Sequence, residues 1–239
     1  MALPTRIGRL HLPVLCFVVS KATVKDGDVE RAVTDAVAGG VTMVQLRDRD
    51  LPSGELLALA RRLKTITRGK ALLMINDRVD IAEACDADGV QLPESGLPTR
   101  VVRSIMGRYV VLGRSVHDAD AAQQAARDGI EFVVAGTIYK SPSKPGQKAA
   151  GVGLLTEITK DSSLPVIAIG GITAEKVEAV IKAGAAGVAV ISAIAGAEDT
   201  KAAAEALTTA LRDAWAAQTA PPAPPAPPPE PAAPAAATA

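Results

Sequence analysis

The sequence is poor in aromatic residues and in cysteine. Two Phe, two Tyr and one Trp are its only aromatic residues among 239, so the core has to consist mainly of aliphatic side chains. The two cysteines, Cys16 and Cys85, lack the paired spacing of zinc and redox motifs. We therefore expect two buried thiols in a protein of the reducing cytoplasm.

The sequence also lacks a long hydrophobic run and an excess of charge. Its apolar runs fall well short of the about 18 residues that cross a bilayer. Arg6, Arg9 and the short run Val14–Val19 do not form a signal peptide, because His11 and Pro13 interrupt them. The 26 basic residues balance the 26 acidic ones, so no net field attracts nucleic acid or an anionic membrane. We expect neither as a partner, and no export.

The last 20 residues differ in composition from the rest of the chain. Residues 220–239 contain nine Pro and nine Ala, with Glu230 and Thr238 as the only others. Such a segment cannot bury enough apolar surface to offset the entropy of ordering it, and proline runs favour extended polyproline II. We expect a disordered tail or linker at 220–239 and one folded domain over 1–219.

Short apolar runs recur along this domain every 20 to 30 residues. They lack the polar alternation of a half-exposed strand, and this is typical of strands covered by helices on one side and a packed interior on the other. The eight runs are Val14–Val19, Met43–Leu46, Ala71–Ile75, Gly89–Leu92, Val110–Gly113, Phe132–Gly136, Pro165–Ile169 and Gly187–Ile191.

Amphipathic segments of helical length lie between the runs. Asp118 and Thr173 stand where N-caps belong, and Gly129 and Gly184 stand where left-handed C-caps belong. A strand followed by a helix, repeated eight times in about 219 residues, matches a (β/α)₈ TIM barrel. A doubly wound sheet is the weaker alternative, because no glycine fingerprint follows the first strand. The segments that predict helices most clearly are Asp28–Ala38, Ser53–Thr67, Asp118–Asp128 and Thr173–Ala183.

Barrel enzymes place their active sites at the carboxyl ends of the strands, so polar residues at those ends are the candidates. Gly170 and Gly171 form a turn into a predicted helix, where free backbone N–H groups can bind an anion. Ser192 and Ala193 follow the eighth run, and loops seven and eight form the common phosphate site of such barrels. These four residues predict a phosphate-binding site.

One of only two histidines, His117, falls at the same end of the barrel, after the fifth run. An imidazole titrates near neutrality, so it can both accept and donate a proton. Arg47 and Arg49 alternate after the second run, so one can point inward, or both can form surface ion pairs with Asp48 and Asp50. His11 precedes the first strand, and we expect it to be structural at the opposite end.

Five motifs stand at these strand ends, namely Gln45–Arg47, Asn76–Ala82, Ala87–Leu92, Ala168–Thr173 and Val190–Ile194. Together they resemble the thiamine-phosphate synthase/TenI superfamily, over roughly residues 14 to 210. The resemblance implies a barrel that handles thiamine precursors by one of two chemistries. A synthase joins a hydroxymethylpyrimidine diphosphate to a thiazole phosphate with Mg²⁺, and a thiazole tautomerase rearranges a carboxythiazole phosphate without metal.

The synthase pattern is matched at most positions but departs from the family after the fourth run. There the synthase has an aspartate that helps Asp77 hold Mg²⁺, and this sequence has Gly96, with Glu94 two residues away as a replacement. Losing one of two carboxylates weakens the site for a hard cation. The resemblance implies that substrate is bound by Gln45, Arg47, Arg49, Asn76, Ser115, Ser141, Ser143 and Lys144, with Arg49, Ser141 and Ser143 in place of the usual Lys and Thr.

The tautomerase branch resembles this sequence at Gln91–Pro93, at Arg47–Arg49 and especially at Gly113–His117. The resemblance implies that His117 is its proton shuttle, and moving a proton between two ring-system carbons does need one group that accepts and then donates. Against it, Asp77 is retained where a tautomerase can have glycine.

Our leading hypothesis from sequence is a thiazole tautomerase with a thiazole phosphate as substrate, His117 as catalytic residue and no cofactor. The alternative is a thiamine-phosphate synthase with Mg²⁺ held by Asp77 and Glu94. A third class, a barrel that binds a thiamine precursor without turning it over, predicts thermal stabilisation by thiazole phosphate alone. A homodimer is one of the oligomeric states that the sequence leaves open.

Overall fold

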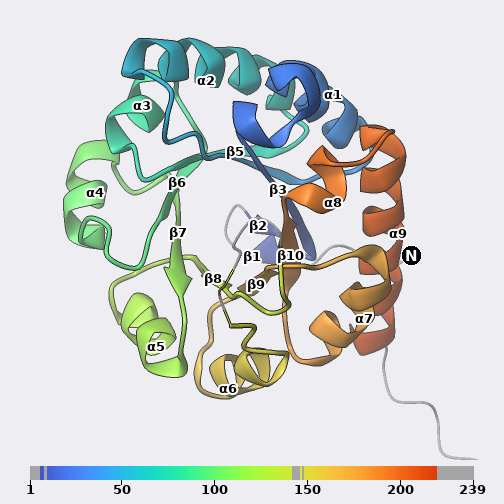
Figure 1. Cartoon of the computed structure of the whole chain (residues 1–239). Coiled ribbons are helices and arrows are strands. Elements are labelled where there is room, and N and C mark those ends of the chain that lie inside the picture. Colours follow the sequence, from blue (N-terminus) through green and yellow to red (C-terminus); the bar gives the residue numbers. More distant parts are fainter. Residues whose placement is uncertain (1–5, 8–9, 142–145, 147, 220–239) are drawn as a thin grey trace, which may run out of the picture.

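Eight parallel strands close into a barrel with helices around it (Figure 1). The computed structural model describes residues 6–7, 10–141, 146 and 148–219. The predicted tail at 220–239 lies outside these residues. Neighbouring strands follow the chain order from β3 to β10, and β10 closes the barrel against β3. The strands are β3 (Val14–Val19), β4 (Met43–Leu46), β5 (Leu72–Asn76), β6 (Gly89–Leu92), β7 (Val111–Val116), β8 (Phe132–Ala135), β9 (Val166–Ile169) and β10 (Gly187–Val190).

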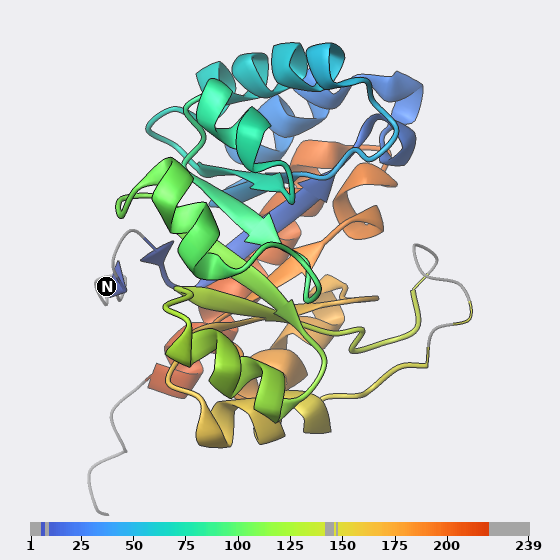
Figure 2. The same cartoon turned by 90° about the vertical axis from the view of Figure 1, so that its left-hand side faces the viewer.

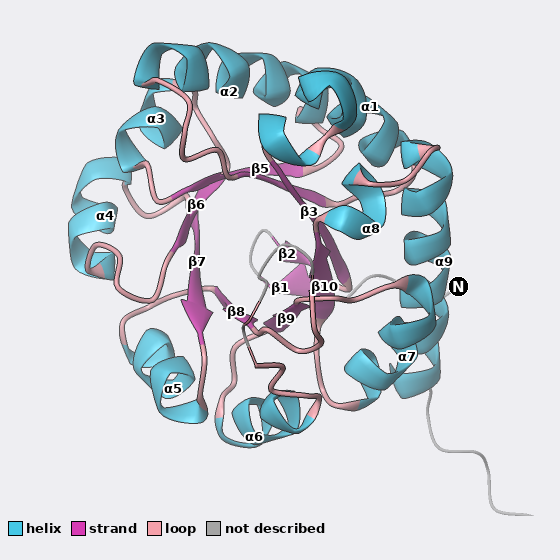
Figure 3. Ribbon diagram, in the orientation of Figure 1, coloured by secondary structure: helices cyan, strands magenta, loops and turns pink. Residues whose placement is uncertain are grey.

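The helices form an outer ring around the strands (Figure 3). The predicted helix Ser53–Thr67 has the same bounds in the structure, and the other three predicted helices agree to within one residue at each end. The helices are α1 (Val29–Ala38), α2 (Ser53–Thr67), α3 (Val79–Ala84), α4 (Thr99–Met106), α5 (Ala119–Arg127), α6 (Gly153–Asp161), α7 (Ala174–Lys182), α8 (Ser192–Ala195) and α9 (Thr200–Thr219), with 3₁₀ turns η1 (Lys21–Thr23) and η2 (Lys25–Gly27).

Caps end and begin the helices where the sequence places them. The Asp118 side chain accepts a hydrogen bond from the backbone N–H of Ala121, which satisfies a free donor in the first turn of α5. Gly129 and Gly184 follow α5 and α7 with φ of 79° and 101°, the left-handed conformation that favours glycine. Within the described residues, no helix is both long and apolar enough to cross a bilayer.

Alternate residues of each strand face two separate cores. On β3, Leu15, Phe17 and Val19 pack with the helices, whereas Val14, Cys16 and Val18 face the barrel interior. Phe132 is the one aromatic residue among the fully buried members of this interior cluster, because the sequence has so few rings. Burial raises the pKa of the Cys16 thiol to about 12, so this cysteine stays protonated inside the barrel. Both cysteines are free and buried, as predicted.

Two features differ from the prediction. Pairing with β8 continues to Val116, so Arg114 and Ser115 lie within β7 rather than after it. The apolar pattern ends earlier than the strand because the last residues of β7 line the polar mouth. The second feature is an antiparallel pair, β1 (Arg6–Ile7) and β2 (Leu10–His11), which lies at the end of the barrel opposite the tips of the strand arrows (Figure 2).

Candidate functional site

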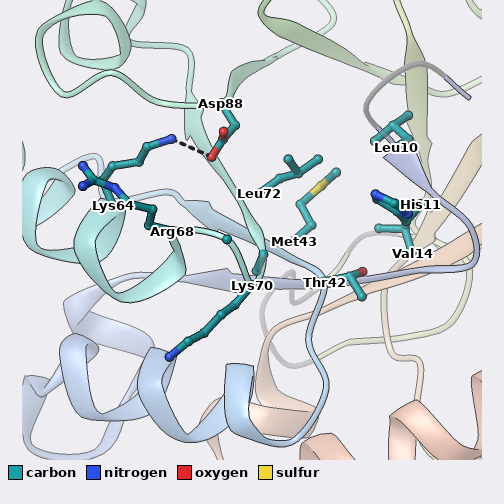
Figure 4. A pocket seen from close by; sticks show the side chains of 12 residues that line it. Leu10, His11, Val14, Thr42, Met43, Lys64, Arg68, Lys70, Leu72 and Asp88 are labelled. Carbon is teal, nitrogen blue, oxygen red and sulfur yellow. Dashed lines mark ion pairs between the residues drawn. The ribbon is translucent and has the colours of Figure 1, made fainter. Parts of the chain in front are cut away.

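Two cavities lie at opposite ends of the barrel. One of about 390 Å³ is at the amino ends of the strands, between β2, β4, β5 and the end of α2. In Figure 4 its Lys64 is turned away to pair with Asp88, while Arg68 and Lys70 extend away from the apolar residues around His11. The other cavity, of about 330 Å³, lies at the carboxyl ends of β9 and β10. Barrel chemistry takes place at that end, so the second cavity is the candidate site.

The Gly170–Gly171 turn shapes the floor of this cavity. Both residues have positive φ, 110° and 62°, a backbone conformation that residues with a side chain rarely adopt. A Cβ on Gly170 would lie 2.6 Å from the Cγ2 of Thr137, and one on Gly171 would lie 2.3 Å from the carbonyl oxygen of Lys140. The turn leads into α7, whose first N–H groups have no partner within the helix. The backbone can therefore approach an anion closely here.

Ser192 and Ala193 complete the cavity from the neighbouring strand end. They are the first residues of the short helix α8, directly after β10. The structure thus brings all four residues of the predicted phosphate site to one cavity. We call Gly170, Gly171, Ser192 and Ala193 the phosphate cradle, after the anion that the sequence predicts for them.

Sequence analysis did not identify two lysines that also line the cavity, Lys140 and Lys176. Lys176, in the first turn of α7, donates from Nζ to the carbonyl of Gly171 at 2.9 Å, and its ammonium lies 4.8 Å from the ring centroid of Tyr139. A cation–π contact holds the charge beside the cradle. In the sequence, Lys176 could have been identified as a lysine in the first turn of the helix that follows Gly170–Gly171. Ser141 lines the same cavity, whereas Ser143 and Lys144 lie outside the described residues.

Amide and hydroxyl side chains line the barrel mouth on the other side, along β4 to β7. Gln45 donates from Nε2 to the Oδ1 of Asn76 at 3.1 Å, and Gln91 donates from Nε2 to the Oγ of Ser115 at 3.3 Å. Each pair joins adjacent strands. The Oε1 of Gln91 is buried and has no hydrogen-bond partner among the described residues. A buried acceptor without a partner is costly, so this oxygen is suited to an N–H or O–H of a ligand.

Charged groups follow β4 and β5 at the same end. Arg47 is half-buried and Arg49 exposed, and in the described part of the chain neither forms an ion pair with Asp48 or Asp50. Burial, and then the charge of Arg49, lowers the pKa of Arg47 from its ordinary value. Asp77 is exposed after β5 with a φ of 63°. This cluster offers two cations and one carboxylate to a ligand.

His117 follows β7 and pairs with Glu94, from the loop after β6. The Nδ1 of His117 and the Oε2 of Glu94 are 2.9 Å apart, with 44% and 47% of the two side chains exposed. The carboxylate expected to help Asp77 hold Mg²⁺ therefore contacts an imidazole. Among the described residues, no group of three or more His, Cys, Asp or Glu is placed to hold a metal ion.

The predicted residues thus form two groups across one mouth. The phosphate cradle, with Lys140 and Lys176, lies at β9 and β10. Opposite it, the reaction side carries the side chains after or within β4 to β7, namely Gln45, Arg47, Arg49, Asn76, Asp77, Gln91, Glu94, Ser115 and His117. A cavity whose backbone can receive an anion on one side, with hydrogen-bonding side chains and an imidazole on the other, suits a phosphorylated heterocycle.

Known proteins match this chain over most of its length. The family model described as thiamine monophosphate synthase matches residues 15–194. Over 184 residues the chain is 46% identical to a thiamine-phosphate synthase of Roseiflexus castenholzii, covering 74% of this chain and 81% of that protein. It is 43% identical over 191 residues to the thiamine-phosphate synthase of Roseiflexus sp. RS-1, covering 77% and 81%. A thiamine phosphate pyrophosphorylase structure from Pyrococcus furiosus superposes with a TM-score of 0.77 at 32% identity, covering 84% of this chain and 96% of that one.

Proposed function

Because the chain belongs to the thiamine monophosphate synthase family and is an enzyme of thiamine biosynthesis, we propose that it is a thiamine-phosphate synthase. It would join a hydroxymethylpyrimidine diphosphate to a thiazole phosphate and release pyrophosphate. The observation that carries the proposal is the 46% identity to a synthase over 81% of that relative's length, together with a phosphate cradle at β9 and β10. The relatives thus favour the alternative that the sequence motifs ranked second.

In this proposal each side of the mouth binds one of the two substrates. The cradle binds the thiazole phosphate through backbone N–H groups, with Lys176 adding a positive charge. Arg47 and Arg49 lie where they can bind the diphosphate of the other substrate, because arginine pairs well with phosphate oxygens. Gln45, Asn76 and Gln91 would orient the pyrimidine by hydrogen bonds. Positioning two bound reactants supplies a large part of the rate.

A magnesium ion fits this arrangement only with help from the substrate. Asp77 supplies one exposed carboxylate, and Glu94 is engaged by His117. Mg²⁺ is commonly held by one or two carboxylates plus substrate phosphates and water, so Asp77 with a diphosphate meets that requirement. When bound, Mg²⁺ neutralises charge on the departing pyrophosphate.

A thiazole tautomerase is the second candidate, and the His117–Glu94 pair favours it. In that reaction a base removes the proton from ring C2 of a carboxythiazole phosphate, and the same group returns a proton to the exocyclic carbon as the ring becomes aromatic. His117 is the proton-transferring residue, and the cradle binds the phosphate. Ser115 and Arg47 lie on the reaction side, where the carboxylate and ring are bound in this scheme.

Turnover of both substrate sets in parallel, with and without Mg²⁺, tests the two candidates. Pyrophosphate release that requires Mg²⁺ and both precursors supports the synthase, and its absence overturns it. Metal-independent isomerisation of the carboxythiazole phosphate that is lost in His117→Ala supports the tautomerase. Thermal stabilisation by thiazole phosphate without either reaction would identify the protein as a binding protein instead.

A further inference from the structure

The loop between β6 and α4 is tied to the end of β7 by one arginine. Arg114 donates from Nη1 to the carbonyls of Pro93 and Glu94, at 3.3 and 3.1 Å, and from Nη2 to the carbonyl of Leu97 at 2.7 Å. Three backbone contacts from a half-buried guanidinium fix where this loop stands. Glu94 is therefore carried on a segment that three hydrogen bonds tie to β7.

The same strand also carries the partner of Glu94. His117 directly follows β7, three residues after Arg114, and its Nδ1 lies 2.9 Å from the Oε2 of Glu94. One strand thus positions the loop with Arg114 and presents the imidazole that the loop's carboxylate contacts. Both side chains are nearly half exposed, so the pair is not a means of burying charge. Its value for stability is small, because exposed ion pairs contribute at most about 1 kcal/mol.

A carboxylate only accepts hydrogen bonds, so contact with Nδ1 requires the proton to be on Nδ1. In neutral imidazole the other nitrogen, Nε2, then carries the lone pair. We infer that Glu94 is a positioning residue, which holds the proton of His117 on Nδ1 and leaves Nε2 as the proton acceptor toward substrate. This inference rests on the proton-transfer role of His117 in the second candidate function.

The inference gives Glu94 a different task from binding metal. If the carboxylate orients the imidazole, then addition of Mg²⁺ and pyrophosphate leaves the His117 tautomer unchanged. If Glu94 serves Mg²⁺ instead, the ion withdraws it from Nδ1 and the tautomer changes. The two roles therefore differ in a spectroscopic property of His117 that needs no turnover.

The test is ¹⁵N NMR of the full chain labelled at histidine, in which only His11 and His117 give signals. His117→Gln assigns the spectrum. For the neutral ring we expect the Nδ1–H tautomer at His117 in the parent protein. Glu94→Gln retains an acceptor oxygen and keeps that tautomer, whereas Glu94→Met removes it and gives a mixture. Glu178→Met, which breaks an exposed pair with Lys182 on α7, is the matched control and leaves His117 unchanged.

Isomerisation kinetics complete the test. In Glu94→Met we expect kcat to fall about tenfold with little change in KM, and Glu94→Gln to restore most of it, by analogy with metal-bound histidines, whose orienting partners typically matter by about 10- to 100-fold. Three results would each overturn the inference. The first is an Nε2–H tautomer in the parent, and the second is a tautomer that does not differ between the parent and Glu94→Met. The third is a change of the His117 tautomer on adding Mg²⁺ and pyrophosphate. A protein with the Nδ1–H tautomer and no isomerisation would remove the tautomerase proposal and leave the positioning of His117 established.

Discussion

The two sides of the barrel mouth are built from different parts of the chain. At β9 and β10 the cradle is made of backbone, with Gly170 and Gly171 in conformations that other residues rarely adopt. At β4 to β7 the surface consists of side chains on ordinary strands, paired as Gln45 with Asn76 and Gln91 with Ser115. A backbone site allows little variation, whereas side chains can be exchanged without moving the fold. In both proposed reactions the cradle would anchor the phosphate, and the side chains at β4 to β7 would decide which reaction takes place.

The largest effect on the reaction rate is expected from a substitution in the phosphate cradle. Gly171→Ala places a Cβ 2.3 Å from the Lys140 carbonyl at a φ of 62°, so the turn has to move. Since a shift of about 1 Å in substrate position can cost about 100-fold in rate, we expect a loss of that order in whichever reaction the enzyme performs. Gly129→Ala is the control, with a φ of 79° and nothing near its Cβ. A fully active Gly171→Ala would show that the cradle does not anchor the substrate.

On the reaction side, removal of the Asp77 carboxylate after β5 tests whether that side binds Mg²⁺. Asp77 has left-handed φ, which asparagine also tolerates, so Asp77→Asn changes charge while keeping the backbone. If this is a synthase, we expect the Mg²⁺ concentration for half-maximal turnover to rise at least about tenfold, which corresponds to about 1.4 kcal/mol of lost attraction. Thiazole phosphate affinity, measured by calorimetry, stays unchanged. An unaltered Mg²⁺ requirement would remove Asp77 from the metal site.

Lys176 tests whether the cradle side uses any side chain at all. Lys176→Met keeps the length of the side chain over Tyr139 but removes the charge beside Gly171. We expect the Kd for thiazole phosphate to rise about tenfold, and the effect to shrink as salt is added. Lys182→Met, at the exposed end of the same helix, serves as the reference variant and should bind as the parent does. Equal affinities for both variants would leave anchoring to the backbone and Lys140.

The smallest effect concerns folding stability on the reaction side. Gln91→Leu removes a buried oxygen that has no hydrogen-bond partner, and this gain offsets the loss of the Nε2 donation to Ser115, so we expect the free energy of unfolding to stay within about 1 kcal/mol of the parent. Gln45→Leu instead leaves the Oδ1 of Asn76 without its donor, so we expect the free energy of unfolding to fall by about 1–2 kcal/mol. Urea unfolding of both variants measures the difference. The reverse order would mean that Gln91 is the better satisfied of the two.

Membership of the barrel class was readable from the sequence because eight apolar runs and their intervening helices impose it locally. The cap residues Asp118, Gly129 and Gly184 mark real helix ends for the same reason. The ends of strands were harder to predict. Arg114 and Ser115 lie within β7 because hydrogen bonding to β8 decides where a strand stops, and hydropathy does not.

The sequence by itself determined the alternation of strand and helix, the Gly-Gly turn and the presence of one histidine at the mouth. Only the tertiary structure decided which side chains meet. Glu94 and His117 are 23 residues apart, and the parallel pairing of β6 with β7 brings their strand ends together so that the carboxylate faces an imidazole. Such contacts depend on the relative placement of elements, which long-range packing sets and local sequence does not encode.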